Sequence, residues 1–136
     1  MKRVAIVLEK NLSPGAIGNA SAILMGQAAL NAPEIYSSQA VLDKDGTRHA
    51  GIQYSTIVLK AGAGQLVHLI QQAREQSSAV GCVAFTSIGQ GLHNQFEEYK
   101  NQLSTKGTAD SAPVGVIVYG NEDEVKLLTK KFSLLQ

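Results

Sequence analysis

Apolar runs alternate with amphipathic segments along the chain. Runs rich in β-branched residues predict strands, and there are four of them: RVAIVLE (3–9), YSTIVLKA (54–61), AVGCVAF (79–85) and VGVIVYG (114–120). The first has too little polar alternation for a half-exposed edge, so we expect it at the centre of a sheet, covered on both faces. The third also reads as a buried strand. The closing FSLL (132–135) is a candidate for a short final strand.

A helix from about Pro14 to Leu30 is predicted directly after the first strand. Ser13 offers a hydroxyl to cap its first turn, and Pro14 suits the first helical position because its missing N–H would be unbonded there anyway. Asn31 and Pro33 are expected to end this helix.

Three further segments have the spacing of helices. Residues 65–76 place four apolar side chains on one face, and residues 92–103 space four apolar side chains by four, three and four positions. In residues 121–131, Asn121 is expected to cap and acidic residues fill the first turn, as the helix dipole favours. The two apolar sets are Leu66, Leu69, Ile70 and Ala73, and Leu92, Phe96, Tyr99 and Leu103.

Strands that alternate with helices indicate an α/β domain with helices on both faces of a sheet, a three-layer αβα sandwich. Residues 37–52 read as a hairpin around Asp45-Gly46, a pair that accepts the positive φ of a tight turn, and this hairpin suggests that the sheet is mixed. The chain shows no repeat or linker, so a single domain over residues 1–136 is expected.

The composition is that of a soluble globular protein, with 44% hydrophobic and 17% charged residues. Twelve basic residues against eleven acidic ones leave almost no positive excess, so nucleic acid is possible as a partner but not favoured. The single cysteine, Cys82, is expected to be an inert core residue. No apolar run approaches the roughly 20 residues of a membrane span or forms a signal-peptide core. We therefore expect a cytoplasmic protein with no membrane partner.

The segment LSPGAIGNASA (12–22) joins a strand to a helix and contains Gly15 and Gly18. It lacks the closing Lys-Ser or Lys-Thr of a phosphate loop and the third glycine of a dinucleotide loop. A bare helix N-terminus still attracts anions. The alternative that we favour is close packing, because Gly18, Ala22 and Gly26 form a small-residue ridge that would let the helix approach a sheet or a symmetry-related helix.

Polar residues near strand ends supply the candidate site. Ligands of open α/β sheets tend to sit beyond the carboxyl ends of strands, and five polar side chains are assigned there: Ser13, Asn19, Lys60, Thr86 and Tyr119. Three of them also have a structural interpretation, since Asn19 would be solvated and both Lys60 and Tyr119, which lie at strand ends, would extend to solvent.

The spacing of the histidines and hydroxyl residues gives little support for a metal site or a nucleophilic active site. The three histidines lie far apart without the H-x-x-x-H or paired Cys/His spacing of a zinc site, so no metal or cofactor is expected. Thr86, Ser87 and His93 could act as nucleophile and base, but no G-x-S-x-G elbow and no orienting acid accompany them.

Two family resemblances emerge from longer segments. VAIVLEKNLSPGAIGNASAILMGQAAL (4–30), VLKAGAGQLVHLIQQAREQ (58–76) and GVIVYGNEDEVKLLTKKFSLL (115–135) resemble the first, second and last strand–helix units of type II peptidyl-tRNA hydrolases. More closely, residues 11–22, 42–52, 85–86 and 127–135 resemble domain of unknown function 2000, a bacterial family grouped with those hydrolases. This second resemblance covers nearly the full chain.

The resemblance implies a compact α/β fold with a mixed, roughly four-stranded sheet between helix layers, and a homodimer. It does not carry the activity over. The hydrolases have a lysine, a glutamine and an aspartate where this chain has Ala16 or Gly18, Ala22, and Thr86. The groups expected to activate water and hold the tRNA end are thus missing.

Three functions remain open from the sequence. The first, which we favour, is a relative that binds a small molecule in a polar crevice formed by the five candidate residues, without the usual catalytic groups. The second is a hydrolase of peptidyl-tRNA or a related ester with altered groups. The third is an interaction protein that uses the ridge of Gly18, Ala22 and Gly26.

Overall fold

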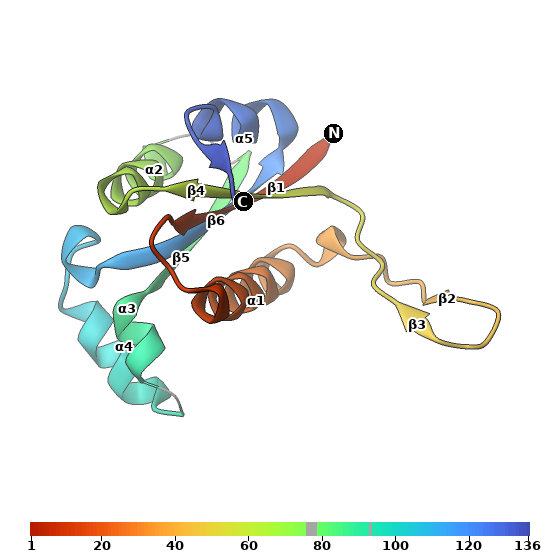
Figure 1. Cartoon of the computed structure of the whole chain (residues 1–136), viewed down its shortest axis with the longest axis horizontal. Helices are drawn as coiled ribbons and strands as arrows, with labels where there is room; N and C mark the ends of the chain where they lie inside the picture. Colours follow the sequence, from red (N-terminus) through yellow and green to blue (C-terminus); the bar gives the residue numbers. More distant parts are fainter. Residues whose placement is uncertain (76–78, 93) are drawn as a thin grey trace.

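The computed structural model of the chain describes residues 1–75, 79–92 and 94–136 (Figure 1). Short 3-10 turns at Pro33–Ile35 and Ala109–Ser111 interrupt the connections. The helices and strands follow in the order β1 (Lys2–Glu9), α1 (Pro14–Asn31), β2 (Val41–Leu42), β3 (Arg48–His49), β4 (Ser55–Ala61), α2 (Ala63–Glu75), β5 (Val80–Thr86), α3 (Ser87–Gly91), α4 (Phe96–Ser104), β6 (Pro113–Asn121), α5 (Glu122–Thr129) and β7 (Ser133–Leu134).

The main sheet has five strands in the order β5-β6-β1-β4-β7. Strand β1 pairs parallel with β4 and antiparallel with β6, and β6 pairs antiparallel with β5. The expected mixed sheet is therefore confirmed, with five strands instead of about four. The additional strand is β7, the short final strand, which pairs antiparallel with β4.

The predicted hairpin forms, but it does not join the main sheet. Strands β2 and β3 make a separate two-stranded sheet that projects away from the body of the molecule (Figure 1). Gly46 has a φ of 87° in its turn, and His49 Nε2 lies 2.8 Å from Asp43 Oδ2 across it. The expected reason for a mixed sheet was thus wrong. The antiparallel strands β6 and β7 make the sheet mixed.

Strand β1 lies at the centre of the sheet, as predicted, with residues 4–8 buried. Its alternate side chains enter two separate cores, because successive residues of a strand face opposite sides. Val4, Ile6 and Leu8 pack with α1, while Ala5 and Val7 pack with α2 and α5. Figure 1 shows α1 on one face of the sheet and α2 and α5 on the other.

Three of the four predicted helices form close to their expected bounds, whereas the helix predicted over residues 92–103 begins only at Phe96, leaves Leu92 outside and has no buried residue. Ser13 Oγ accepts a hydrogen bond from Ala16 N at 3.3 Å, and α1 runs from Pro14 to Asn31. The apolar face of α2 is buried as its spacing indicates. Asn121 Oδ1 accepts from Glu124 N at 3.1 Å at the start of α5. Within the described residues, no helix combines the length and apolar character needed to cross a membrane.

Strand β5 differs from the prediction of a buried strand. It lies at the edge of the sheet, and its first five residues are half-buried. Cys82 is among them, and burial raises the pKa of its thiol to about 11 despite the opposing charge effect of Arg74. The thiol is therefore protonated at neutral pH, which makes it a poor nucleophile. An apolar run alone does not distinguish an edge strand from a central one when helices cover both of its faces.

The small-residue ridge of α1 does not pack on the sheet, which was one of the two partners expected for it, and packing on a symmetry-related helix stays a prediction. Gly18, Ala22 and Gly26 are exposed, and a Cβ added at Gly18 or Gly26 would meet nothing within 4 Å. The buried side of the helix consists of Ala20, Leu24 and Ala28.

A glycine is required for close approach elsewhere, at Gly81 of β5. Gly81 pairs with Tyr119 on β6, and a Cβ at Gly81 would overlap the Tyr119 ring. That ring is 8% exposed, and its hydroxyl accepts a hydrogen bond from Asn31 Nδ2 at 3.2 Å. The ring therefore has little freedom to move away from an added methyl group.

We predict that Gly81→Ala lowers the free energy of unfolding by about 1–3 kcal/mol, the typical cost of overpacking. Gly91→Ala is the matched control, because a Cβ at Gly91 meets nothing within 4 Å. Thermal melting of both variants measures the difference. Equal melting temperatures would show that the Tyr119 ring does not need the glycine.

Candidate functional site

The directions of the strands decide which predicted site residues can meet. Because β5 and β4 both run parallel to β1, the carboxyl ends of these three strands lie at one edge of the sheet. Lys60 and Thr86 lie at the ends of two of these strands, and Ser13 follows the third. The structure therefore brings three of the five candidates to the same edge.

Tyr119 lies at the other end of the sheet, which corrects its assignment to the crevice. Strand β6 is antiparallel, and Tyr119 pairs with Val4 whereas Lys60 pairs with Leu8. Four residues of strand separate the two positions by roughly 13 Å. The Tyr119 hydroxyl binds Asn31 at the end of α1, which gives this residue a structural role.

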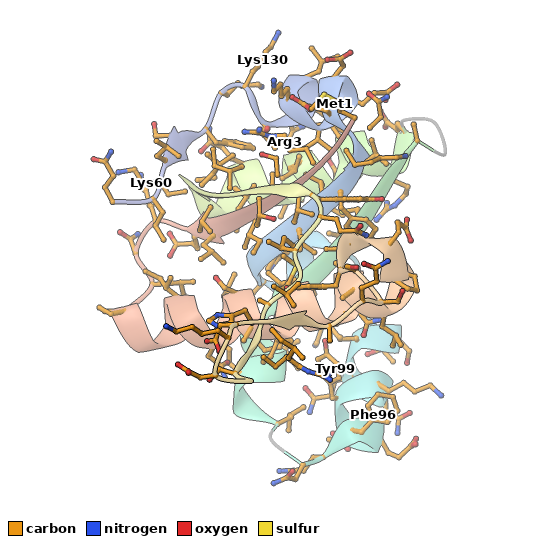
Figure 2. All side chains as sticks on the ribbon, turned by 90° about the vertical axis from the view of Figure 1, so that its right-hand side faces the viewer. Met1, Arg3, Lys60, Phe96, Tyr99 and Lys130 are labelled. Atoms are coloured by element: carbon orange, nitrogen blue, oxygen red, sulfur yellow. The ribbon has the colours of Figure 1, made fainter. Side chains whose placement is uncertain are left out.

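The remaining candidates point in different directions. Ser13 caps α1, and Asn19 is exposed on the second turn of that helix. Lys60 is half-buried, and its pairing with Leu8 puts it on the α1 face of the sheet. Figure 2 shows Lys60 far from Tyr99 and Phe96, on the opposite side of the view. The five residues do not converge on one crevice.

Thr86 is buried, with 3% of its surface exposed. Its hydroxyl accepts a hydrogen bond from Gly89 N at 3.2 Å and caps α3. A hydroxyl that caps a helix in this way is already committed to a structural role. His93, the partner expected in the nucleophile–base alternative, lies outside the described residues.

A pocket of about 440 Å³ does open at this edge. Glu9 at the end of β1 and the first turn of α2 form part of its wall, together with Ser87 and the residues that lead into β6. Side chains such as Val67 and Val114 make the lining mainly apolar. This position matches the general rule for ligand sites of α/β sheets.

Glu9 is the charged residue of this pocket. Its carboxylate is held by the next turn of the chain, since Oε2 accepts from Asn11 N at 2.9 Å and Oε1 from Asn11 Nδ2 at 3.2 Å. At the neighbouring start of α2, Gln65 Oε1 accepts from Gly62 N at 2.8 Å. The helix start is thus capped by its own side chain, and the pocket presents a fixed negative group.

Ala112, another residue of the pocket lining, has an unusual backbone conformation. Its φ of 55° and ψ of 67° lie in the left-handed region, which costs a residue with a Cβ roughly 1–2 kcal/mol. The Ala112 carbonyl accepts a hydrogen bond from Ser87 N at 3.1 Å, which joins two segments of the lining. Backbone strain of this kind is concentrated at functional sites.

The sequence pattern did not indicate Glu9 or Ala112 as site residues. An acidic residue at the end of a buried strand was the available signal for Glu9. Nothing in the sequence around Ala112 marks a left-handed backbone, because alanine rarely adopts it. Across residues 1–75, 79–92 and 94–136, no three His, Cys, Asp or Glu side chains are grouped so that they could hold a metal ion.

These features define a mixed α/β protein with a five-stranded sheet and a pocket at the carboxyl edge of its parallel strands. The chain belongs to the family described as a protein of unknown function, DUF2000, whose model matches residues 2–136. The resemblance of the sequence to this family is thereby confirmed.

The fold is shared with a solved structure of a protein of unknown function from Agrobacterium tumefaciens strain C58. The TM-score is 0.85 at 16% identity, over 98% of this chain and 96% of that chain. At this identity the likeness shows the fold alone. No curated protein matches the chain.

We predict that Thr86→Val lowers the free energy of unfolding by about 1 kcal/mol, because it keeps the volume but removes the capping oxygen. Thr86→Ser keeps the oxygen and is expected to retain most of the stability. Chemical denaturation of the two variants measures this order. A serine variant less stable than the valine variant would show that the Thr86 methyl group matters more than the cap.

Proposed function

We propose that this protein binds a small amphipathic molecule in the pocket at the carboxyl edge of β1, β4 and β5. The observation that supports the proposal is the pocket itself, whose mainly apolar lining includes Glu9, a residue with a carboxylate held by Asn11. Its volume of about 440 Å³ falls in the range of small-molecule sites, roughly 300–1,000 Å³.

The lining indicates the chemistry of the ligand. The Glu9 carboxylate favours a hydrogen-bond donor, and an amine would gain a charge-assisted bond. Val67 and Val114 favour an apolar body. An anionic ligand is disfavoured, since Glu9 would repel it and Gln65 already binds the N–H of Gly62 at the start of α2. We therefore propose a ligand with an apolar body and a primary amine.

This chemistry also favours binding over the hydrolase alternative. A peptidyl-tRNA would bring phosphates to the edge where Glu9 is the charged group of the pocket. Thr86 stands where the hydrolases have an aspartate, and its hydroxyl caps α3. Likeness to the hydrolase scaffold therefore enters the proposal as architecture without its reaction.

We predict that hexylamine binds this pocket whereas hexanoate, which has the same apolar chain and the opposite charge, does not. Binding is expected to shift the backbone amide NMR signals of Ser87 and Ala112. Glu9→Gln should weaken hexylamine binding about tenfold or more, since a hydrogen bond to a charged group contributes about 1.5–3 kcal/mol.

The matched control is Glu75→Gln, which makes the same change at an exposed residue at the far end of α2. It should leave hexylamine binding unchanged. Hexanoate binding as tightly as hexylamine would contradict the proposal, and so would an affinity that Glu9→Gln does not alter.

A second proposal concerns the outward face of α1. We propose that it forms the interface of a homodimer, because this 18-residue helix contains no charged residue. The ridge of Gly18, Ala22 and Gly26 faces solvent, and Leu30 continues it with 74% of its surface exposed. Small residues let two helices approach closely.

We predict that the native chain sediments as a dimer and that Gly26→Leu sediments as a monomer, because a bulky side chain would separate the two helices. Gly91→Leu is the control, since Gly91 also has open space around its Cα. Analytical ultracentrifugation makes the measurement. An unchanged sedimentation coefficient for Gly26→Leu would refute the interface.

A further inference from the structure

Helix α4 lies outside both cores of the molecule. It lies beyond the end of β5 together with α3 (Figure 1), and none of its nine residues is buried. Phe96 begins the helix with 67% of its surface exposed. Tyr99 follows one turn later on the same face, because residues three apart are neighbours on a helix. An aromatic face is therefore presented outside the two cores.

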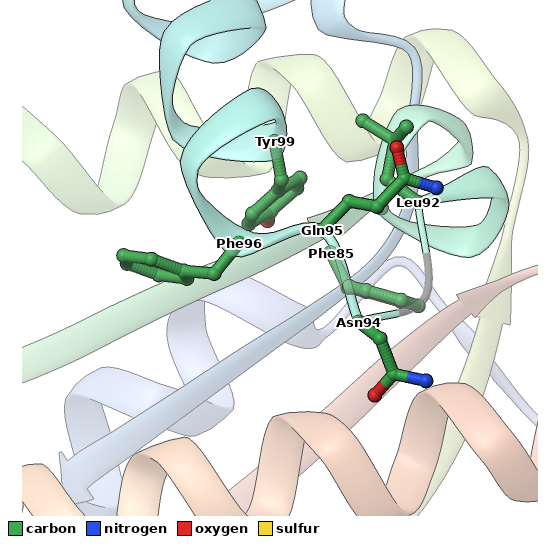
Figure 3. Close-up of a pocket in the computed structure, with 7 residues that line it drawn as sticks. Phe85, Leu92, Asn94, Gln95, Phe96 and Tyr99 are labelled. Carbon is green, nitrogen blue, oxygen red and sulfur yellow. The ribbon is translucent and has the colours of Figure 1, made fainter.

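That face forms one side of a second pocket, with a volume of about 400 Å³. Figure 3 shows Phe96 and Tyr99 projecting from α4, with Phe85 coming from the end of β5. Phe85 is 7% exposed and anchors this pocket to the α1-side core. The Phe85 and Tyr99 rings both lie close to Gly89, whereas the Phe96 ring points away from them in Figure 3, so Phe96 lines the open edge of the cavity.

Gly89 of α3 makes room for two of these rings. A Cβ at this position would lie 2.6 Å from Phe85 Cε1 and 3.1 Å from Tyr99 Cε1. Both rings therefore lie against the backbone of α3. The Tyr99 hydroxyl is part of this wall, and burial raises its pKa. Glycine at this position lets the pocket keep its present shape.

Two carboxamides stand at the rim of the aromatic pocket, on Asn94 and Gln95. Gln95 immediately precedes α4, yet its side chain makes no capping hydrogen bond. Within the described part of the chain, neither carboxamide has a hydrogen-bond partner. Asn94 has a φ of 61°, a conformation that asparagine tolerates better than most residues. Each amide can both donate and accept a hydrogen bond.

The charged side chains of α4 have a net negative charge, since Glu97 and Glu98 outnumber Lys100. Glu97 and Glu98 are exposed in the first turn of α4, directly after Phe96. They complement the helix dipole and oppose the approach of an anion at this end of the helix. A phosphorylated ligand is disfavoured for this reason.

We propose that this aromatic pocket binds a planar heteroaromatic molecule of the nucleobase or nucleoside type that carries no phosphate. Its ring would stack on the aromatic side chains, since stacking tolerates any π-face and contributes about 1–3 kcal/mol per base. Asn94 and Gln95 would bind the donor and acceptor groups at the edge of the ring. This site is separate from the pocket at Glu9 and does not depend on it.

The experiment is a calorimetric titration of the full chain with adenosine, adenosine 5′-monophosphate and cyclohexanol. Adenosine is expected to bind, the monophosphate to bind more weakly and the saturated ring not to bind. Phe96→Ala should weaken adenosine binding at least fivefold without changing the melting temperature, because the Phe96 ring is mainly exposed. Leu127→Ala is the control, since Leu127 is 58% exposed on α5 and should leave binding unchanged.

Two further variants test the polar rim. Asn94→Gly removes the amide and keeps the left-handed backbone without strain, and Gln95→Ala removes an amide that caps nothing. Each is expected to weaken adenosine binding and to leave hexylamine binding unchanged. Absence of adenosine binding at millimolar concentration would overturn the proposal. It would also be overturned by equal binding of cyclohexanol, by the monophosphate binding as tightly as adenosine, or by an unchanged affinity in Phe96→Ala.

Discussion

The antiparallel pairing of β6 with β1 is the constraint on which the rest of the structure depends. It lies in the middle of the sheet, and residues 116–118 of β6 and 4–8 of β1 are buried. Because β5 then pairs antiparallel with β6, its direction is that of β1 and β4. The carboxyl ends of three strands meet at one edge for this reason, and Glu9 and Ser87 come to line the same pocket.

The parts of the fold that depend on nearby residues could be predicted from the sequence. The cap at Ser13, the buried face of α2 and the cap at Asn121 each depend on side chains within about one helical turn. Strand neighbours and strand directions depend on contacts between residues far apart in the chain. The edge position of β5, the separation of the β2–β3 hairpin and the exposure of the α1 ridge follow from such contacts, and local patterns do not encode them.

The candidate site, like the fold, could be predicted only as far as it depends on local sequence signals. The rule that ligands sit beyond strand ends led to Lys60 and Thr86 at the edge where the Glu9 pocket opens, but placing Tyr119 required the direction of β6. The sequence did not predict the aromatic pocket, because the spacing of Phe96 and Tyr99 is that of any amphipathic helix. The aromatic face of α4 lies outside the two cores because of the direction in which the chain continues after β5. That direction is a property of the tertiary structure.

Three consecutive residues connect the two cavities. Phe85 lines one and Ser87 the other, and between them Thr86 is tied to Gly89. The Ser87 N–H is bound to Ala112, so the backbone of this short segment is held at both ends. Because the two cavities share this backbone segment, a substitution that displaces it would change the walls of both.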